Sequence, residues 1–222
     1  MPQQKADEED VGDHRREEER SDWMPMLTLS AVAEDPLVLT RPVRLPGGGE
    51  VAFRPLTHGD ADELASFLQG LSAGSRRLAT FDGYDLRAAR ELCDAIARYD
   101  KLRLVLSEVV SGRIVGLLEL SLDLHPSDIT RYREAGVSLT ATDCRFGPTL
   151  ADDYQGKGVG TQVFPLIADV ARRFGRKRII LWGGVLANNP RAIRYYEKQG
   201  FRTVGSFTDA DGARALDMIL DL

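Results

Sequence analysis

Three glycines, Gly156, Gly158 and Gly160, stand at alternate positions between a segment with strand character and a segment with helix character. Glycines at such a junction let backbone N–H groups approach a ligand closely, and the positive end of a helix dipole attracts anions. The spacing therefore favours phosphate binding. The chain lacks the Walker A string GxxxxGK followed by Ser or Thr, and a dinucleotide loop would need its third glycine where Thr161 or Val163 stands.

The periodicity of apolar residues predicts the elements around this loop. Strands are predicted over residues 37–45, 51–56, 101–110, 113–124, 144–150, 179–185, 201–207 and 214–222. Helices are predicted over residues 57–70, 85–96, 128–134, 159–174 and 189–199. Because hairpins alternate with strand–helix–strand crossovers, we expect an α/β fold with a mixed sheet and helices on both of its faces.

Two irregular features lie close to the glycine loop in the sequence. Gly147 and Pro148 interrupt the strand over 144–150, which predicts a bend or a bulge, unless the pair only ends the strand. The polar segment His125–Thr142 is longer than a hairpin connection needs, and its charges suit polar recognition better than core packing. We therefore expect this segment at the rim of a binding groove or at a homodimer contact.

Two strings carry a resemblance to a known family. The first, LADDYQGKGVGTQV at 150–163, contains Gln155-x-x-Gly158-x-Gly160, and the second is NNPRAIRYYEKQGF at 188–201. In order and separation they resemble the two signatures of the GCN5-related N-acetyltransferase (GNAT) family, of which the first is an acetyl-CoA pyrophosphate loop. The second string matches the family pattern at Asn189, Ala192, Tyr196, Gly200 and Phe201.

The resemblance covers about three quarters of the chain and implies a GNAT-like fold. It implies an α/β (α+β) arrangement with a mixed, mostly antiparallel sheet of about seven strands, splayed between the family's strands 4 and 5, with helices on both faces. It also implies acetyl-CoA as co-substrate, with the pantetheine arm paired to backbone around Thr149 and Leu150. The residues implied for this site are Thr149, Leu150, Gln155, Gly156, Lys157, Gly158, Val159, Gly160, Thr161, Asn189 and Tyr196.

The same resemblance implies acetyl transfer to a primary amine of a protein or small molecule, by direct attack in a ternary complex. Tyr196 matches the tyrosine that protonates the departing thiolate, and core packing is its alternative use. Many relatives carry a glutamate where Arg145 stands here. Glu119 and Asp143 are the nearby carboxylates. Glu119 is the predicted base, and a water chain or no dedicated base are the alternatives. The departure at Arg145 keeps a second function open, a non-catalytic acetyl-CoA-binding sensor or interaction module.

Charge and composition narrow the function classes. Residues 1–22 hold nine acidic and four basic residues and the rest of the chain holds 25 of each, so the net charge of −5 lies in the tail. A body without net charge does not favour nucleic acid as a partner, and the cysteine and histidine spacing suggests no metal site. No apolar run is long enough to cross a membrane, and we expect a cytoplasmic protein.

The chain divides into three predicted segments. Residues 1–22 form a charged tail, residues 23–50 an N-terminal extension with a strand, and residues 51–222 one acetyltransferase domain. The tail lacks apolar residues that could offset the entropy of ordering, so we expect it to be disordered and dispensable for the fold and for cofactor binding. A chain of 222 residues with 43% hydrophobic residues can build one core without disulfides.

Overall fold

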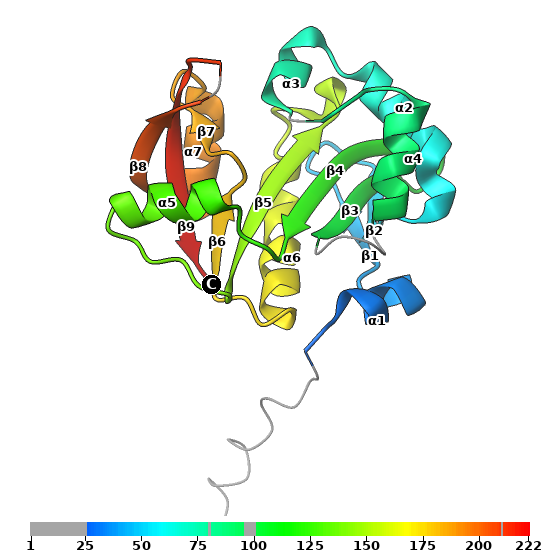
Figure 1. Cartoon of the computed structure of the whole chain (residues 1–222). Coiled ribbons are helices and arrows are strands. Elements are labelled where there is room, and N and C mark those ends of the chain that lie inside the picture. The colour runs from blue at the N-terminus through cyan, green and yellow to red at the C-terminus, as the bar shows by residue number, and fades with distance from the viewer. Residues whose placement is uncertain (1–25, 80, 96–100, 210) are drawn as a thin grey trace, which may run out of the picture.

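The computed structural model describes residues 26–79, 81–95, 101–209 and 211–222. Within these residues the strands form one nine-stranded sheet (Figure 1). The strands are β1 (Arg41–Arg44), β2 (Glu50–Pro55), β3 (Lys101–Glu108), β4 (Ile114–Ser121), β5 (Asp143–Leu150), β6 (Arg178–Leu181), β7 (Val185–Leu186), β8 (Arg202–Thr208) and β9 (Arg214–Asp221). Their order is β1-β2-β3-β4-β5-β6-β9-β7, and β8 pairs with β9. The β5–β6 pair is parallel and the other pairs of these described strands are antiparallel.

This sheet confirms the predicted mixed, mostly antiparallel architecture. The sheet has two strands more than the seven that the resemblance implies, because β1 comes from the N-terminal extension and β7 is a separate strand of two residues. The strand predicted over 37–45 begins at Arg41, since Pro36–Val38 forms a 3₁₀ turn. The single strand predicted over 179–185 is divided into β6 and β7, since Gly183–Gly184 adopts left-handed φ angles of 70° and 71°.

In the described part of the chain, seven α-helices cover the two faces of the sheet (Figure 1). They are α1 (Leu29–Glu34), α2 (Ala61–Gly70), α3 (Ala73–Leu78), α4 (Leu86–Asp94), α5 (Pro126–Glu134), α6 (Val159–Arg173) and α7 (Pro190–Lys198). Helices α1, α6 and α7 share one core cluster with Leu118 and Phe146, whereas α2 and α4 pack around Leu117 on the opposite face. None of these helices combines the length and apolar character that crossing a membrane requires.

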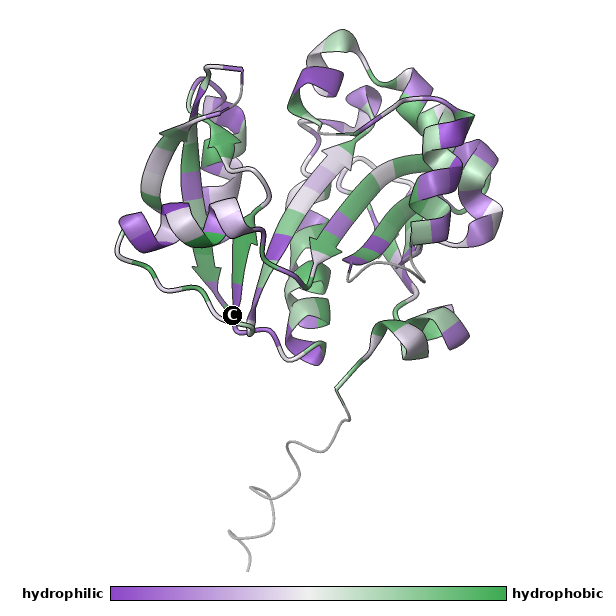
Figure 2. Cartoon of the chain, viewed as in Figure 1, coloured by the Kyte–Doolittle hydropathy of each residue, from purple (hydrophilic) through white to green (hydrophobic). Residues whose placement is uncertain are grey.

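The helix after the glycine loop follows its apolar periodicity. Val159, Val163, Ile167 and Val170 recur every three or four residues and are all buried against the sheet. Figure 2 shows the matching hydrophobic character of the central strands β3 and β4. Gly175, with a φ of 70°, follows the end of α6, as is common where a helix terminates. The burial of this face therefore fixes the first turn of α6 against the sheet, directly after the loop that leaves β5.

The sheet opens between β5 and β6. Their parallel pairing joins Asp143–Phe146 to Arg178–Leu181 and does not continue along the described chain beyond these residues. In contrast, β5 remains paired with β4 as far as Leu150 without a change in register. The bulge predicted at Gly147–Pro148 is therefore wrong, whereas the predicted splay is confirmed, because β5 diverges from β6 at this point (Figure 1).

Backbone alternation along β5 determines which groups face the gap. The N–H of Ala151 donates to the carbonyl of Val115 at 2.9 Å. Ala151 and Thr149 therefore direct their backbone groups toward β4, and Pro148 and Leu150 direct theirs toward the β6 side. Pro148 has no N–H to donate, which costs no ladder hydrogen bond at a place where β6 has already diverged.

The segment His125–Thr142 contributes buried side chains to the core, so the expectation that its charges suit recognition rather than packing is wrong for Asp128, whereas Arg131 lines a surface cleft. It contains α5, whose Tyr132 is fully buried and donates a hydrogen bond to the carbonyl of Met218 (2.7 Å). Asp128 is also buried and forms an ion pair with Arg131 (2.6 Å). Removing this segment would expose β6 and β9, because Tyr132 packs against both strands.

The first described residues dock on the body, since the N–H of Leu27 donates to the carbonyl of Arg173 (2.8 Å). The predicted tail, residues 1–22, lies outside the described residues. We expect deletion of 1–22 to leave the melting temperature and the affinity for acetyl-CoA unchanged, as measured by thermal unfolding and calorimetry. Deletion of residues 1–35 is the comparison and should lower the melting temperature, because it removes Val32 from the core. A fall of many degrees after the shorter deletion would contradict this expectation.

Candidate active site

A cleft of about 1900 Å³ follows the gap between β5 and β6 and is bordered by α3, α6 and α7. Ten of the eleven residues predicted to bind acetyl-CoA line it. They are Thr149, Leu150, Gln155, Gly156, Gly158, Val159, Gly160, Thr161, Asn189 and Tyr196. The eleventh, Lys157, is exposed and lies outside the lining. The cleft thus brings together the two strings that the sequence analysis singled out.

The glycine loop has the geometry of an anion-binding helix start. Gly156 and Gly158 have left-handed φ angles of 73° and 77°, which strain any other side chain. Gly158 is the N-cap of α6, so the N–H groups of the first turn, from Val159 onward, have no partner within the helix. Gly160 is needed for a different reason, because a Cβ there would lie 3.0 Å from the ring of Tyr195. Free backbone donors and the positive end of the helix dipole suit a pyrophosphate.

A hydrogen-bond network fastens this loop to α3. Gln155 Nε2 donates to Ser75 Oγ (2.9 Å) and to the carbonyl of Leu150 (3.0 Å). Asp152 accepts from Ser72 N–H (2.9 Å), Ser72 Oγ (2.7 Å) and Ser75 Oγ (2.8 Å). The hydrogen bonds from Ser72 and Ser75 lower the pKa of Asp152, which keeps it ionised. Sequence reasoning missed α3; the available signal was Ser72, which caps it.

The two β5 residues predicted to pair with the pantetheine arm differ in orientation. The register opposite Leu117 directs the backbone of Thr149 toward β4, so Thr149 contributes only to the lining. Leu150 directs its backbone toward the gap, although its carbonyl already accepts from Gln155. The groups that face the gap for an extended ligand are therefore the N–H of Leu150 and the carbonyl of Pro148.

Helix α7 contributes Asn189 and Tyr196 to the cleft. Asn189 is the N-cap, and its Oδ1 accepts from the N–H of Ala192 (3.1 Å). The Tyr196 ring is 9% exposed and packs against Tyr195 and Phe201, with centroids 5.0 and 5.4 Å away. Burial raises the pKa of Tyr196, so the phenol keeps its proton at neutral pH. Its hydroxyl makes no hydrogen bond to any residue that the structure describes, and Tyr196 is among the residues that line the cleft.

The predicted base, Glu119, stands on β4 outside the cleft lining. Its Oε1 lies 3.1 Å from Nε of Arg103, and burial raises the pKa of Glu119. The other carboxylate considered from the sequence, Asp143, is fully buried and held by two nitrogens of Arg178 at 2.6 and 2.7 Å. Asp143 is therefore a structural residue, and the role of Glu119 as the base stays a prediction, since Glu119 lies outside the cleft lining and pairs with Arg103.

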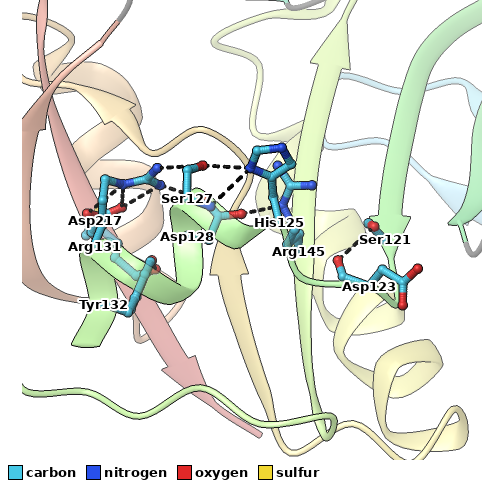
Figure 3. A network of polar contacts seen from close by, with 10 residues as sticks. Ser121, Asp123, His125, Ser127, Asp128, Arg131, Tyr132, Arg145 and Asp217 are labelled. Carbon is cyan, nitrogen blue, oxygen red and sulfur yellow. Dashed lines mark hydrogen bonds and ion pairs between the residues drawn. The ribbon is translucent and has the colours of Figure 1, made fainter. Parts of the chain in front are cut away.

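Arg145 stands where the family resemblance implies a glutamate in many relatives. Its Nε lies 2.8 Å from Oδ2 of Asp128 on α5, and its guanidinium carbon lies 4.2 Å from the centre of the Trp182 ring. Figure 3 shows Arg145 reaching from β5 toward Asp128. Arg145 is thus held between Asp128 and Trp182, and it is not among the residues that line the cleft.

We expect Glu119→Gln to lower the free energy of unfolding by ~3 kcal/mol, because Arg103 would then be buried without a charged partner. Urea denaturation measures this change. The double variant Arg103→Met/Glu119→Leu should recover most of the loss, since it leaves no unpaired charge. A loss below ~1 kcal/mol for the single variant would show that the pair does not hold this part of the sheet. If Glu119 is the base, the single variant also lowers kcat and shifts its pH profile.

A splayed sheet with a glycine-rich helix start in the gap defines an acetyltransferase-type fold. A family model described as Acetyltransferase (GNAT) family matches residues 75–201, and the chain belongs to this family. Among curated proteins it is similar to Acetyltransferase PA5475 of Pseudomonas aeruginosa, with 29% identity over 135 residues that cover 61% of this chain and 67% of the relative. The resemblance inferred from the two strings is confirmed, and acetyl transfer is the general activity that the family supports.

Solved structures show the same fold. The GNAT domain of S. lividans PAT has a TM-score of 0.62 at 24% identity and covers 84% of this chain and 99% of its own. Mycobacterium smegmatis RimJ in complex with CoA-disulfide has a TM-score of 0.61 at 19% identity, covering 82% and 86%. AAC(6')-Ib in complex with ribostamycin and coenzyme A has a TM-score of 0.60 at 21% identity, covering 77% and 93%.

Proposed function

We propose that the protein transfers the acetyl group of acetyl-CoA to a primary amine of a protein or small molecule by direct attack in a ternary complex. The observation that carries this proposal is that Tyr196 borders the same cleft as the glycine loop at 155–161. A helix start suited to a pyrophosphate and a phenol able to donate a proton therefore meet in one cavity.

The residues of the cleft fit acetyl-CoA along its length. When bound, this co-substrate supplies an acetyl group activated as a thioester. The N–H groups at the start of α6, from Val159 to Thr161, suit the pyrophosphate. The N–H of Leu150 and the carbonyl of Pro148 suit the amides of the pantetheine arm. Asn189 uses its Oδ1 as a helix cap, which leaves its Nδ2 to donate to the same arm.

The chemistry needs one proton donor and one proton acceptor. The amine nitrogen forms a bond to the carbonyl carbon, and the bond from that carbon to sulfur breaks. Tyr196 gives its hydroxyl proton to the departing sulfur, a role that is supported by a hydroxyl without a hydrogen-bond partner among the described residues. The amine loses its proton to Glu119, the predicted base. Water accepts the proton instead if the Glu119 carboxylate stays paired with Arg103.

The solved structure of AAC(6')-Ib, which contains both ribostamycin and coenzyme A, supports a ternary complex on this fold. In this chain the acceptor side of the cleft is bordered by α3 and by Ser127 and Arg131 of α5. These helices supply the side chains that would face an acceptor, which supports the expectation that the segment 125–142 influences acceptor choice.

A second candidate function is a protein that binds acetyl-CoA without turnover. The observation that favours it is the cation at Arg145, together with the arginine that holds Glu119. An assay of released CoA thiol over a panel of primary amines separates the two functions. Acetyl transfer predicts thiol and acetylated amine in equal amounts. Binding of acetyl-CoA without thiol release on any amine would favour the non-catalytic function instead.

A further inference from the structure

Two cations, Lys101 and Arg145, contact the ring of Trp182 from behind the cleft, since neither of them is itself among the residues that line it. Trp182, the residue after β6, lines the cleft. Nζ of Lys101 lies 4.4 Å from the centre of the Trp182 ring, and the guanidinium carbon of Arg145 lies 4.2 Å from it. The two cations thus lie within about 9 Å of each other, because both contact the same ring. The strand register places them in one row, since Lys101 and Arg145 both pair with Ser121 of β4.

Both cations have hydrogen-bonding capacity that the protein does not use. Within the described residues Lys101 makes no hydrogen bond or ion pair, and burial lowers its pKa. Arg145 approaches Asp128 through Nε, and neither of its terminal nitrogens has a hydrogen bond to a residue that the structure describes. Beside them, Arg103 is only 5% exposed, and its Nη1 is buried without an acceptor.

The carboxylates of this region already have arginine partners. Glu119 pairs with Arg103, Asp128 lies between Arg131 (2.6 Å) and Arg145 (2.8 Å), and Asp217 pairs with Arg131 (3.1 Å). Figure 3 shows the chain of contacts from Arg145 through Asp128 and Arg131 to Asp217. Lys101 has no direct ion pair among the described residues; Glu119, whose partner is Arg103, and Asp82 act on it only through their charge. A cationic acceptor entering here would meet two cations, and an anionic acceptor would meet free donors.

We propose that the acceptor is an amine that also carries a carboxylate, the amino acid class, and that Lys101 and Arg145 hold this carboxylate beside Trp182. This inference rests on the proposed acetyl transfer. It gives Arg145 a use at a position where many relatives have a glutamate, because a substrate carboxylate requires a cation. It also disfavours polyamines and aminoglycosides, whose charges would find no free carboxylate among the described residues of this row.

The test uses matched acceptors that differ in one group: L-phenylalanine, its amide and phenethylamine, and L-lysine with cadaverine. We expect kcat/KM to be ~10-fold or more higher for each amino acid than for its amide or decarboxylated amine, the range expected for one charged hydrogen bond. Lys101→Met should raise KM for the amino acids by ~10-fold or more and reduce the ratio of kcat/KM between each amino acid and its amide or decarboxylated amine. Lys101→Arg, which keeps the positive charge, should retain the ratio of the unmodified protein. Lys177→Met, at an exposed lysine away from the cleft, is the control and should change neither value.

Calorimetry of the protein–CoA complex with the same compounds measures acceptor binding without turnover. If the amino acids bind more tightly than their amides and decarboxylated amines, and Lys101→Met weakens this binding, the inference is supported. This holds even if no amine is acetylated, because in that case only the proposed acetyl transfer fails. Equal or tighter binding of the amide and the decarboxylated amine overturns the inference, whether or not the protein is active. An unchanged preference in Lys101→Met, with an unchanged melting temperature, also overturns it.

Discussion

Replacing Gly158 and Gly160 together with alanine should weaken acetyl-CoA binding by ~100-fold or more. Gly158 has a φ of 77° and opens α6, so a side chain there strains the N-cap and moves the first-turn N–H groups. A Cβ on Gly160 would lie 3.0 Å from the Tyr195 ring and displace the helix start. The loss of two hydrogen bonds to a charged pyrophosphate corresponds to at least this factor. Calorimetric titration with acetyl-CoA measures the change.

Gly112→Ala is the matched control for this effect. Gly112 has a φ of 76°, almost that of Gly158, but it stands in the turn between β3 and β4, with nothing within 4 Å of an added Cβ. Alanine there carries the same backbone strain as at Gly158 without a steric clash, so Gly112→Ala should lose some stability and keep its acetyl-CoA affinity. Equal affinity in the Gly158 and Gly160 variant and in this control would show that the loop does not hold the pyrophosphate.

Tyr196→Phe should reduce kcat by ~100-fold and leave acetyl-CoA affinity nearly unchanged. A positioned proton donor contributes about this factor, and the substitution removes only the hydroxyl. The ring keeps its contacts with Tyr195 and Phe201, so the melting temperature should hold. Single-turnover release of CoA thiol on a good acceptor measures the rate of the chemical step.

Tyr195→Phe is the control variant on the neighbouring residue. Its hydroxyl donates to the carbonyl of Gly160 at 3.3 Å and has a partner, unlike that of Tyr196. Removing it should change kcat by less than about threefold, because a long neutral hydrogen bond contributes little. If the two phenylalanine variants turned over at the same rate, Tyr196 would be a packing residue.

Much of the fold and the phosphate loop could be predicted from the sequence because the signals there are local. The apolar repeat of α6, the glycines before it and the cap at Asn189 each fix a backbone conformation within a few residues. The splay was expected from the resemblance. The predicted bulge failed because the missing N–H of Pro148 faces a gap, and only the strand register reveals on which side of β5 that gap lies.

The acceptor side could not be predicted, because it depends on contacts between residues distant in sequence. The short helix α3 has no apolar repeat and is held by Asp152, some eighty positions later. The charges of α5 suggested an exposed segment, whereas Asp128 is buried between two arginines from different elements. From the sequence alone, Arg145 could be interpreted only as a departure from the family pattern, because neither Trp182 nor Lys101 is near it in the sequence.

Mass spectrometry after a single turnover with isotope-labelled acetyl-CoA and an amine acceptor is the most direct test of the proposed acetyl transfer in the cleft between β5 and β6. Direct transfer predicts the labelled acetyl group on the acceptor nitrogen, one released CoA thiol for each acetylated acceptor, and unlabelled protein. Labelled acetate without acetylated acceptor, or a labelled protein side chain on the path to the product, would contradict it.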